Sequence, residues 1–238
     1  MKNISYILID MKTRVTIIVP YRNREIHMNQ FIDMFRKYFI DLDSDFTLVF
    51  VEQYNEKPFN RGKLLNVGMK EFYNKTEYFI NHDIDILPNM DCIKNIYDTH
   101  NLDYDVTRIF SAHDTSCGGL IKFHSNILSN MNGYPNDVWG WGIEDRAFYY
   151  RCKYMNIKLS PRCNSKFSFN SLNHTSNSQV YTKEKQKQSE SWTDNFLNQL
   201  SKDELSSMIN INGFNDVEYH IINREQKDNN IVVLKVDI

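Results

Sequence analysis

Short apolar runs alternate with stretches of helical periodicity over roughly the first eighty residues, and this order limits the folds open to the chain. Residues 15–19 are continuously apolar and rich in β-branched side chains, and Pro20 closes them, which predicts a buried strand. Residues 46–51 and 78–80 predict two more strands. Apolar residues at helical spacing follow the first strand, and Asn60 is a suitable N-cap for a second helix. The alternation predicts an α/β fold whose parallel strands present ligands at their carboxyl ends.

The pattern changes in the second half of the chain. We expect, in order, a strand at 118–123 entered through a glycine turn, a helix after Asp145, a polar loop or lid at 173–191, a short helix at 193–209, and a hairpin that pairs 217–222 with 231–236 across 227–230. The polar segment carries no apolar period, which is why no regular element is predicted for it.

Composition and charge exclude several classes of protein. A hydrophobic content of 41% and an aromatic content of 13% in 238 residues indicate a folded globule. The net charge of −2, with scattered Lys and Arg, gives no reason to expect a nucleic-acid partner. Four cysteines without Cys-x-x-Cys spacing predict free thiols in a reducing compartment. The apolar stretch at the N-terminus is too short for a signal peptide or a membrane span, so we expect a soluble, cytoplasmic protein.

Two acidic residues, Asp83 and Asp85, follow the expected third strand. On an extended backbone their carboxylates would point to the same side, where two hard oxygen ligands suit Mn²⁺ or Mg²⁺ bridging a diphosphate. His174, at the start of the polar segment, is the natural second ligand. The structural alternative is a turn that ends the strand, with His174 as an ordinary surface or core histidine.

Residues 139–145 read Trp-Gly-Trp-Gly-Ile-Glu-Asp. Indole rings offer flat apolar faces with one N–H each, and the glycines permit unusual backbone angles. Two adjacent acids, Glu144 and Asp145, behind such a segment suit a sugar-like acceptor that is stacked, oriented and then deprotonated. In a low-dielectric pocket each acid raises the pKa of the other, which brings a base toward neutral pH. The structural alternative is the first turn of a helix, where the dipole favours acids, and both interpretations can hold together.

Two basic segments lie at the expected ligand edge. Arg22 and Arg24 follow the first strand, and their guanidinium groups could grip a diphosphate or a nucleotide base. Phe59 and Arg61 lie at the start of the second helix, where free N–H groups favour anions. Neither a dinucleotide-binding Gly-x-Gly-x-x-Gly, nor a P-loop, nor a Gly-x-Ser-x-Gly elbow occurs, so dehydrogenases, P-loop enzymes and α/β-hydrolases lose their main support.

The chain carries five motifs in order: Val-Pro-Tyr-Arg-Asn-Arg (19–24), Phe-Asn-Arg-Gly-Lys-Leu-Leu-Asn-Val-Gly (59–68), His-Asp-Ile-Asp-Ile-Leu-Pro (82–88), Cys-Gly-Gly (117–119) and Asn-Gly-Tyr-Pro-Asn-Asp-Val-Trp-Gly-Trp-Gly-Ile-Glu-Asp (132–145). Together they resemble the β-1,4-galactosyltransferase family over most of the chain. The resemblance implies a GT-A fold, which is a Rossmann-like mixed sheet flanked by helices, and an inverting single displacement with a UDP-sugar donor. It also implies one domain over 1–238, with a nucleotide-sugar and metal half at 14–90 and an acceptor half at 110–238. The chain looks like a catalytic domain alone, as in a bacterial or viral relative.

The resemblance also implies roles for individual residues. Asp145 matches the catalytic base, and Glu144 matches the neighbouring acid that contacts acceptor and donor. Asp85 and His174 match metal ligands, and Trp141 matches the tryptophan of a mobile loop that packs over both substrates. The implied donor or nucleotide contacts are Pro20, Tyr21, Arg22, Arg24, Phe59, Arg61, Asp83, Ser116 and Trp141, and the implied acceptor contacts are Trp141, Gly142, Glu144 and Asp145.

Three positions depart from the family pattern. Arg146 stands where the family usually has a third acid, which could reshape acceptor binding. Ser171 replaces a soft methionine ligand of some members, which favours a harder site that also accepts Mg²⁺. Ser116 replaces a bulky tyrosine of galactose-specific members, so a donor with an N-acetyl group, UDP-GalNAc, competes with UDP-Gal.

The sequence therefore predicts a metal-dependent, inverting glycosyltransferase that uses Mn²⁺ or Mg²⁺. It would move galactose or N-acetylgalactosamine from UDP to a hydroxyl of an acceptor glycan, and the polar loop would order when donor and metal bind. One alternative is a non-catalytic sugar- or nucleotide-binding module of the same fold. Another is a transferase that uses UDP-GlcNAc or UDP-glucose.

Overall fold

The protein combines nine strands and five α-helices within the part of the chain that the structure describes. The computed structural model describes residues 12–100, 103–111, 113–140, 142–162, 169–172, 207 and 209–238. The strands are β1 (Arg14–Tyr21), β2 (Asp45–Gln53), β3 (Tyr78–His82), β4 (Ile86–Pro88), β5 (Val106–Phe110), β6 (Leu120–His124), β7 (Phe169–Ser171), β8 (His220–Asp228) and β9 (Ile231–Asp237). The α-helices are α1 (Glu25–Tyr38), α2 (Arg61–Phe72), α3 (Met90–Cys92), α4 (Leu128–Met131) and α5 (Glu144–Tyr154), with 3₁₀ turns at Tyr73–Lys75 and Ser125–Ile127 and a π-helical segment at Ile93–Tyr97.

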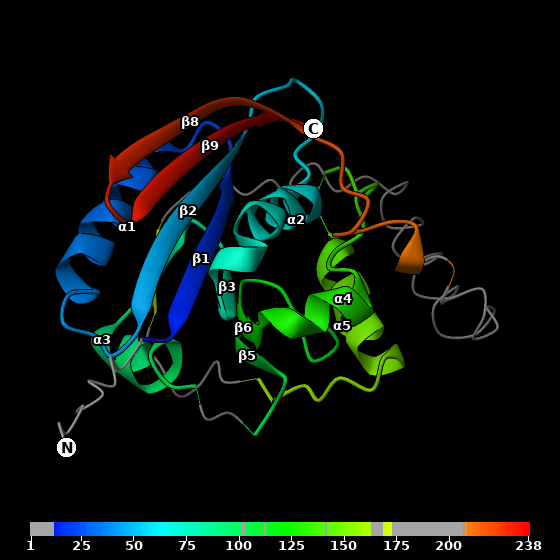
Figure 1. Cartoon of the computed structure of the whole chain (residues 1–238), viewed down its shortest axis with the longest axis horizontal. Helices are drawn as coiled ribbons and strands as arrows, with labels where there is room; N and C mark the ends of the chain where they lie inside the picture. Colours follow the sequence, from blue (N-terminus) through cyan, green and yellow to red (C-terminus); the bar gives the residue numbers. More distant parts are fainter. Residues whose placement is uncertain are drawn as a thin grey trace, which may run out of the picture.

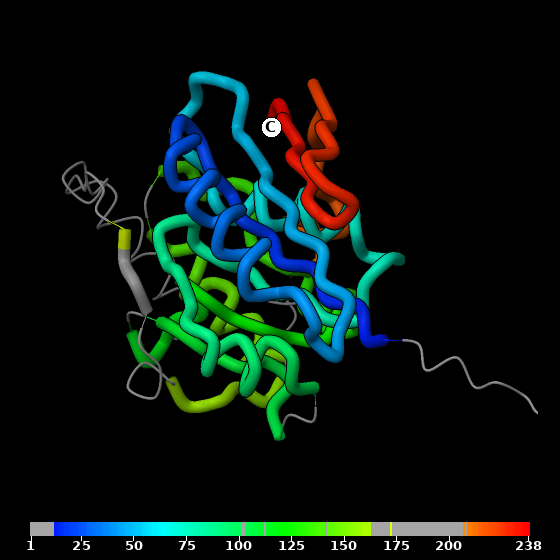
Figure 2. The backbone as a smooth tube through the Cα atoms, turned by 90° about the vertical axis from the view of Figure 1, so that its left-hand side faces the viewer, coloured from blue at the N-terminus to red at the C-terminus, as the bar shows by residue number. Residues whose placement is uncertain are grey.

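One seven-stranded sheet has the order β5-β6-β3-β1-β2-β9-β8, and β4 pairs with β7 in a second, two-stranded sheet (Figure 1). Strands β3, β1, β2 and β9 run parallel, so their carboxyl ends share one edge of the sheet. Strand β6 is antiparallel to β3, and its first residue, Leu120, pairs with His82 at that same edge. Figure 2 shows the β8–β9 hairpin, in orange and red, beside the light-blue β2 segment from a distant part of the sequence.

Different helices cover the two faces of the large sheet. Ile17 and Val19 of β1 pack in the cluster that contains Phe31 of α1, whereas Ile18 packs in the cluster that contains residues of α2 and α5. Successive side chains of a strand point to opposite faces, so the continuous apolar run of β1 fills both layers. Figure 1 shows α1 on one side of the sheet and α2 and α5 on the other.

The first half of the fold confirms the expected elements. Strands β1, β2 and β3 and helices α1 and α2 occur where the apolar patterns predict them. The side chain of Asn60 accepts a hydrogen bond from the Lys63 backbone N–H at 2.9 Å, which confirms the N-cap of α2. Helix α5 follows the Trp-Gly-Trp-Gly segment, and its first residue is Glu144.

Other expectations need correction or fall outside the structure. The hairpin is present, but its first strand is His220–Asp228 rather than 217–222, because β8 is an exposed polar strand without an alternating pattern. Strands β4, β5 and β7 are absent from the sequence prediction. Trp141, Cys163, His174, the loop expected at 173–191 and almost all of the helix expected at 193–209 lie outside the described residues.

Two further expectations concern thiols and membrane spans. Cys117 and Cys152 are buried free thiols, as the cysteine spacing predicts. No helix among the residues that the structure describes is long and apolar enough to cross a bilayer.

A buried lysine joins β6 to the end of the π-helical segment. Lys122 is fully buried, and its Nζ donates hydrogen bonds to the carbonyls of Ile96 at 2.9 Å, Tyr97 at 2.6 Å and Thr99 at 2.8 Å. These carbonyls end a helical segment and lack intrahelical donors, so the ammonium satisfies them and matches the negative end of the helix dipole.

Candidate active site

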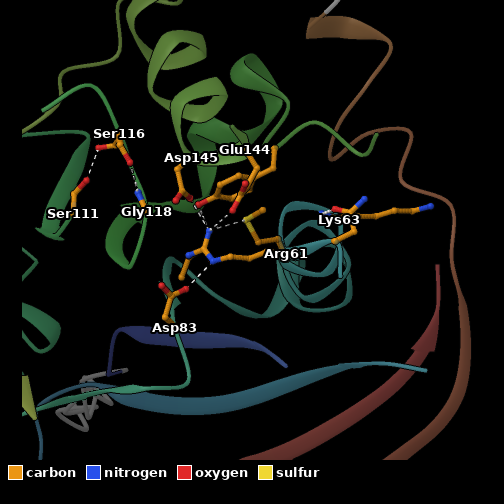
Figure 3. A network of polar contacts seen from close by, with 12 residues as sticks. Arg61, Lys63, Asp83, Ser111, Ser116, Gly118, Glu144 and Asp145 are labelled. Carbon is orange, nitrogen blue, oxygen red and sulfur yellow. Dashed lines mark hydrogen bonds and ion pairs between the residues drawn. The ribbon is translucent and has the colours of Figure 1, made fainter. Parts of the chain in front are cut away.

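The ends of three elements meet at the carboxyl edge of the parallel strands. Strand β3 ends just before Asp83, helix α2 begins at Arg61 and helix α5 begins at Glu144. The segment that leads into β6 carries Ser116 and Gly118 to the same place (Figure 3). Asn60 orients Arg61, because its side chain caps α2 while its backbone N–H donates to Gln53 Oε1 at 2.9 Å.

Arg61 holds the acids of the site together. Its Nε donates to Asp83 Oδ1 at 2.7 Å, and its Nη1 donates to Asp145 Oδ1 at 2.7 Å, with Glu144 Oε1 at 3.8 Å from Nη1. The exposed fractions of these side chains are 12% for Arg61, 32% for Asp83, 7% for Glu144 and 28% for Asp145. Figure 3 shows the guanidinium between Asp83 on one side and the two α5 acids on the other. The structure thus brings together four of the predicted site residues.

Unusual backbone angles place the two acids at the start of α5. Gly140 and Gly142 have φ values of 92° and 90°, and Ile143, the N-cap residue, has a φ of 82°. Positive φ is costly for a β-branched residue, so the surrounding contacts must hold it in place. The hydrogen bond from Gly140 N to Phe59 O at 2.8 Å ties Gly140 to the chain before α2.

Burial sets the protonation of the two acids. Burial and the adjacent Asp145 raise the pKa of Glu144 to about 8, so Glu144 is mainly protonated at neutral pH. Its Oε2 is buried and has no hydrogen-bond partner among the described residues. Burial also raises the pKa of Asp145, while the Arg61 guanidinium opposes the rise and favours the carboxylate. The arrangement therefore favours the neutral form of Glu144, while the contact with Arg61 favours the form of Asp145 that can accept a proton.

The backbone after β3 corrects one step of the sequence argument. Residues 84 and 85 form a turn, and Ile86 N donates to Asp83 O at 3.3 Å, so Asp83 and Asp85 do not lie on an extended strand. The alternation that would point both carboxylates to one side is therefore wrong. Asp83 pairs with Arg61 instead.

Asp85 lies where the short sheet reaches the site. Strand β7 pairs with β4, and Leu172 N donates to Asp85 O at 2.8 Å just beyond that ladder. His174 comes two residues after Leu172 in the sequence and lies outside the described residues. The described residues alone contain no group of three or more His, Cys, Asp or Glu side chains that could hold a metal ion.

The other basic segment forms a separate set of contacts. Arg22 Nη1 donates to Lys57 O at 2.6 Å and to Asn55 O at 3.3 Å, and its guanidinium carbon lies 5.8 Å from the centre of the Phe59 ring. Arg24 Nη1 is buried without a hydrogen-bond partner among the described residues, so it could receive a ligand oxygen. Before these arginines, Pro20 and Tyr21 are buried, and the Tyr21 hydroxyl donates to Glu52 Oε2 at 3.4 Å.

Ser116 is buried rather than lining an open space. Its exposed fraction is 4%, and its Oγ accepts a hydrogen bond from Gly118 N at 3.2 Å. An N-acetyl group of the donor would therefore fit beside Ser116 only if this segment shifted when the donor binds.

Sequence reasoning identified Asn60 only as a cap and missed that it and Asn66 fasten the 134–136 loop to α2. Asn66 Nδ2 donates to Tyr134 O at 2.7 Å and to Asn136 Oδ1 at 2.8 Å, and Asn60 Nδ2 donates to Asn136 O at 2.7 Å. Both asparagines fall inside the 59–68 motif and Asn136 falls inside the 132–145 motif, so the signal was present. A polar residue on the apolar side of a helix calls for a buried partner, and the second motif supplies it.

Comparison with known families identifies the chain. A model of the N-terminal region of glycosyl transferase group 7 matches residues 9–100, and a model described as the N-terminal domain of galactosyltransferase matches residues 103–175. The chain belongs to glycosyltransferase family 7, the β-1,4-galactosyltransferase family. The two matched segments contain all the acids and arginines described above.

Similar proteins include several members of this family. Bovine (Bos taurus) β-1,4-galactosyltransferase 1 is 30% identical over 155 residues, and human (Homo sapiens) β-1,4-galactosyltransferase 4 is 32% identical over 155 residues. Each alignment covers 62% of this chain but only 38% and 44% of the respective relative, so the chain spans less than half of their length.

Solved structures confirm the expected GT-A fold. A mutant of Drosophila β-1,4-galactosyltransferase 7, in complex with manganese, UDP-Gal and xylobiose, has a TM-score of 0.73 at 19% identity, covering 95% of this chain and 94% of its own. A mannosyltransferase from Pyrobaculum calidifontis, in complex with GDP-Man and Mn²⁺, has a TM-score of 0.50 at 16% identity, covering 64% of this chain and 55% of its own.

Proposed function

We propose that this member of the family is an inverting, metal-dependent glycosyltransferase that moves galactose or N-acetylgalactosamine from a UDP-sugar to a hydroxyl of an acceptor glycan. The observation that carries the proposal is the ion-paired cluster in which Arg61 holds Asp145 at 2.7 Å beside the buried Glu144. A binding module has no need for a carboxylate that is partly exposed, oriented by a cation and next to a neutral acid. The names of the relatives, which are galactosyltransferases, support the reaction class.

In this proposal Asp145 is the general base. Its Oδ1 accepts from Arg61 and its Oδ2 faces Gly118, and the carboxylate, whose side chain is 28% exposed, would accept the proton of the acceptor hydroxyl. The acceptor oxygen then forms a bond to the anomeric carbon of the donor sugar as the bond from that carbon to the UDP oxygen breaks, so UDP leaves with the electron pair. Attack on the face opposite the leaving group inverts the anomeric configuration.

Glu144 acts as a hydrogen-bond donor rather than a second base. It is mainly protonated at neutral pH, because burial and Asp145 raise its pKa to about 8. A neutral carboxylic acid can donate to a sugar hydroxyl and so orient a substrate next to the base.

The remaining roles rest on the resemblance of the five motifs to the family. We assign donor and nucleotide contacts to Pro20, Tyr21, Arg22, Arg24, Phe59, Arg61, Asp83, Ser116 and Trp141, and acceptor contacts to Trp141, Gly142, Glu144 and Asp145. Guanidinium groups at the carboxyl edge of parallel strands suit a diphosphate, and the buried, unpartnered Nη1 of Arg24 supports this assignment.

Asp85 and His174 are the residues that would hold Mn²⁺, with Mg²⁺ as the alternative ion. The backbone contact between Asp85 and Leu172 supports the pair, because it ties the chain two residues before His174 to Asp85. A carboxylate and an imidazole together fit Mn²⁺. When bound, the ion would neutralise charge on the leaving diphosphate.

The proposal is tested by UDP release from UDP-Gal, UDP-GalNAc, UDP-GlcNAc and UDP-glucose with Mn²⁺, with and without a panel of sugar acceptors. We expect acceptor-stimulated release from UDP-Gal or UDP-GalNAc. Loss of the base in Asp145→Asn should lower the rate by about 100- to 10,000-fold. The control is Asp91→Asn, which removes an exposed acid on α3.

Three results would contradict the proposal. A preference for UDP-GlcNAc or UDP-glucose would show that the transferred sugar is neither galactose nor N-acetylgalactosamine. No release with any donor, together with a UDP-dependent thermal shift, would favour the binding module. Full activity of Asp145→Asn would show that Asp145 is not the general base.

A further inference from the structure

Gly118 faces the carboxylate of Asp145 at a distance that leaves no room for a side chain. A Cβ atom built on Gly118 would lie 1.9 Å from Asp145 Oδ2 and 2.5 Å from Asp145 Cγ. The backbone of Gly118 is not in the left-handed region, unlike that of Gly119, whose φ is 76°. Glycine is therefore needed at 118 for space and not for backbone conformation.

The segment that carries Gly118 is held from behind. Arg108 is buried, and its Nη1 donates to Asp114 O at 2.5 Å and to Ser116 O at 3.3 Å. Ser111 Oγ donates to Ser116 O at 2.9 Å, and Ser116 Oγ accepts from Gly118 N at 3.2 Å. These bonds prevent the segment from moving away from α5 without leaving buried polar groups unpaired.

Asp145 is fixed on its other sides as well. Its Oδ1 accepts from Arg61 at 2.7 Å, and its backbone O accepts from Cys117 N at 3.1 Å. The carboxylate thus lies between a guanidinium and the backbone of Gly118, as Figure 3 shows.

We propose that Gly118 is a positioning residue for Asp145: its bare backbone forms one wall of the slot in which the carboxylate sits, and Arg61 forms the other. The inference rests on the proposed role of Asp145 as the base. An alanine at 118 keeps a permitted backbone but fills the slot, so the carboxylate must leave Arg61 and turn away from the acceptor position.

The kinetic test compares the parent with Gly118→Ala. A displacement of about 1 Å at a reacting group can lower a rate by about 100-fold, so we expect kcat to fall by about that factor. The donor KM should change little, because Gly118 has no assigned contact with the nucleotide. An unchanged kcat would overturn the proposal.

The structural test needs no activity. We expect Gly118→Ala to lower the melting temperature when Asp145 is present and to have little effect in an Asp145→Ala background, where the slot is empty. Gly119→Ala is the matched control: its Cβ would meet Phe110 Cδ1 at 2.7 Å, so its loss should be equal in both backgrounds.

The two tests separate the inference from the proposed function. An equal loss for Gly118→Ala in both backgrounds would show that the Cβ meets something other than Asp145 and would overturn the proposal. The effect of Gly118→Ala on stability could depend on Asp145 while the parent releases no UDP from any donor. That result would establish the contact but would overturn the role of Gly118 in positioning a base. If Gly118→Ala folds only together with Asp145→Ala, that rescue supports the contact.

Discussion

At the carboxyl edge of the sheet, one basic side chain and three acidic side chains lie close together with little access to water. Arg61 is one cation among Asp83, Glu144 and Asp145, and all four side chains are at most one-third exposed. Such a group is stable only if part of the negative charge is neutralised. Protonation of Glu144 provides this neutralisation, because burial raises the pKa of its carboxyl group.

The stability of the protein should therefore depend on Glu144 and on pH. The pKa of Glu144 is about 8 in the folded protein and about 4.3 in an unfolded chain, so the folded state binds more protons between these values. The contribution of Glu144 to the free energy of unfolding is therefore fully present below its pKa in the unfolded chain. It is lost as the pH rises through its pKa in the folded protein. Calorimetry from pH 5 to pH 9 should show a steeper fall in melting temperature for the parent than for Glu144→Gln.

Other groups titrate over the same range, so the difference between parent and variant is the relevant quantity. Glu56→Gln serves as the control, because Glu56 is exposed, and its curve should follow that of the parent. A curve for Glu144→Gln that runs parallel to the parent would contradict a protonated Glu144.

At the scale of elements, short segments depend on partners from far along the chain. The π-helical segment Ile93–Tyr97 ends against Lys122 of β6, which satisfies the carbonyls of Ile96, Tyr97 and Thr99. A five-residue segment has too few internal hydrogen bonds to be stable alone.

Lys122→Met should keep the aliphatic volume but leave these buried carbonyls without a donor. We expect a loss of about 3 kcal/mol in the free energy of unfolding, measured by urea denaturation. The matched control is Lys94→Met in the same segment, whose side chain is exposed, and it should cost less than about 0.5 kcal/mol. Equal effects of the two changes would show that Lys122 does not support the segment.

Sequence patterns predicted elements far better than they predicted the pairs that join elements. Continuous apolar runs gave β1 and β2, and a capping asparagine gave the start of α2, because these signals are local. The Arg61 contacts span 22 residues to Asp83 and 84 to Asp145, and no local pattern encodes such a distance. Residue chemistry singled out the acids and arginines of the site, and the five-motif resemblance supplied their separate roles, whereas the contact between Gly118 and Asp145 is visible only in the folded structure.

At the scale of the whole molecule, the sheet is completed by residues from opposite parts of the sequence. Strand β9 lies between β2 and β8, and Leu48 of β2 pairs with Ile231 of β9. Leu234 is fully buried in the cluster that contains α2, so β9 contributes to the core and is not an appendage.

Leu234→Asp should therefore prevent stable folding. A carboxylate placed in this cluster would lose its water, and its cross-strand neighbour Arg224 already pairs with Glu71, so we expect a loss of about 4 kcal/mol or more. The control is Ile222→Asp on β8, where the parent side chain is 44% exposed and the cost should be small. Soluble yield and circular dichroism would measure both, and a folded Leu234→Asp protein would contradict the central role of β9.

The parallel pairing of β2 with β9 affects how the protein folds during its synthesis. A ribosome adds residue 231 long after β2 has emerged, so β2, which has β1 on one side, keeps its other edge open through most of the synthesis. Such an edge can recruit a strand from a neighbouring nascent chain. The cell must therefore shield it, and we expect yield in a heterologous host to depend on chaperone supply and on slow translation.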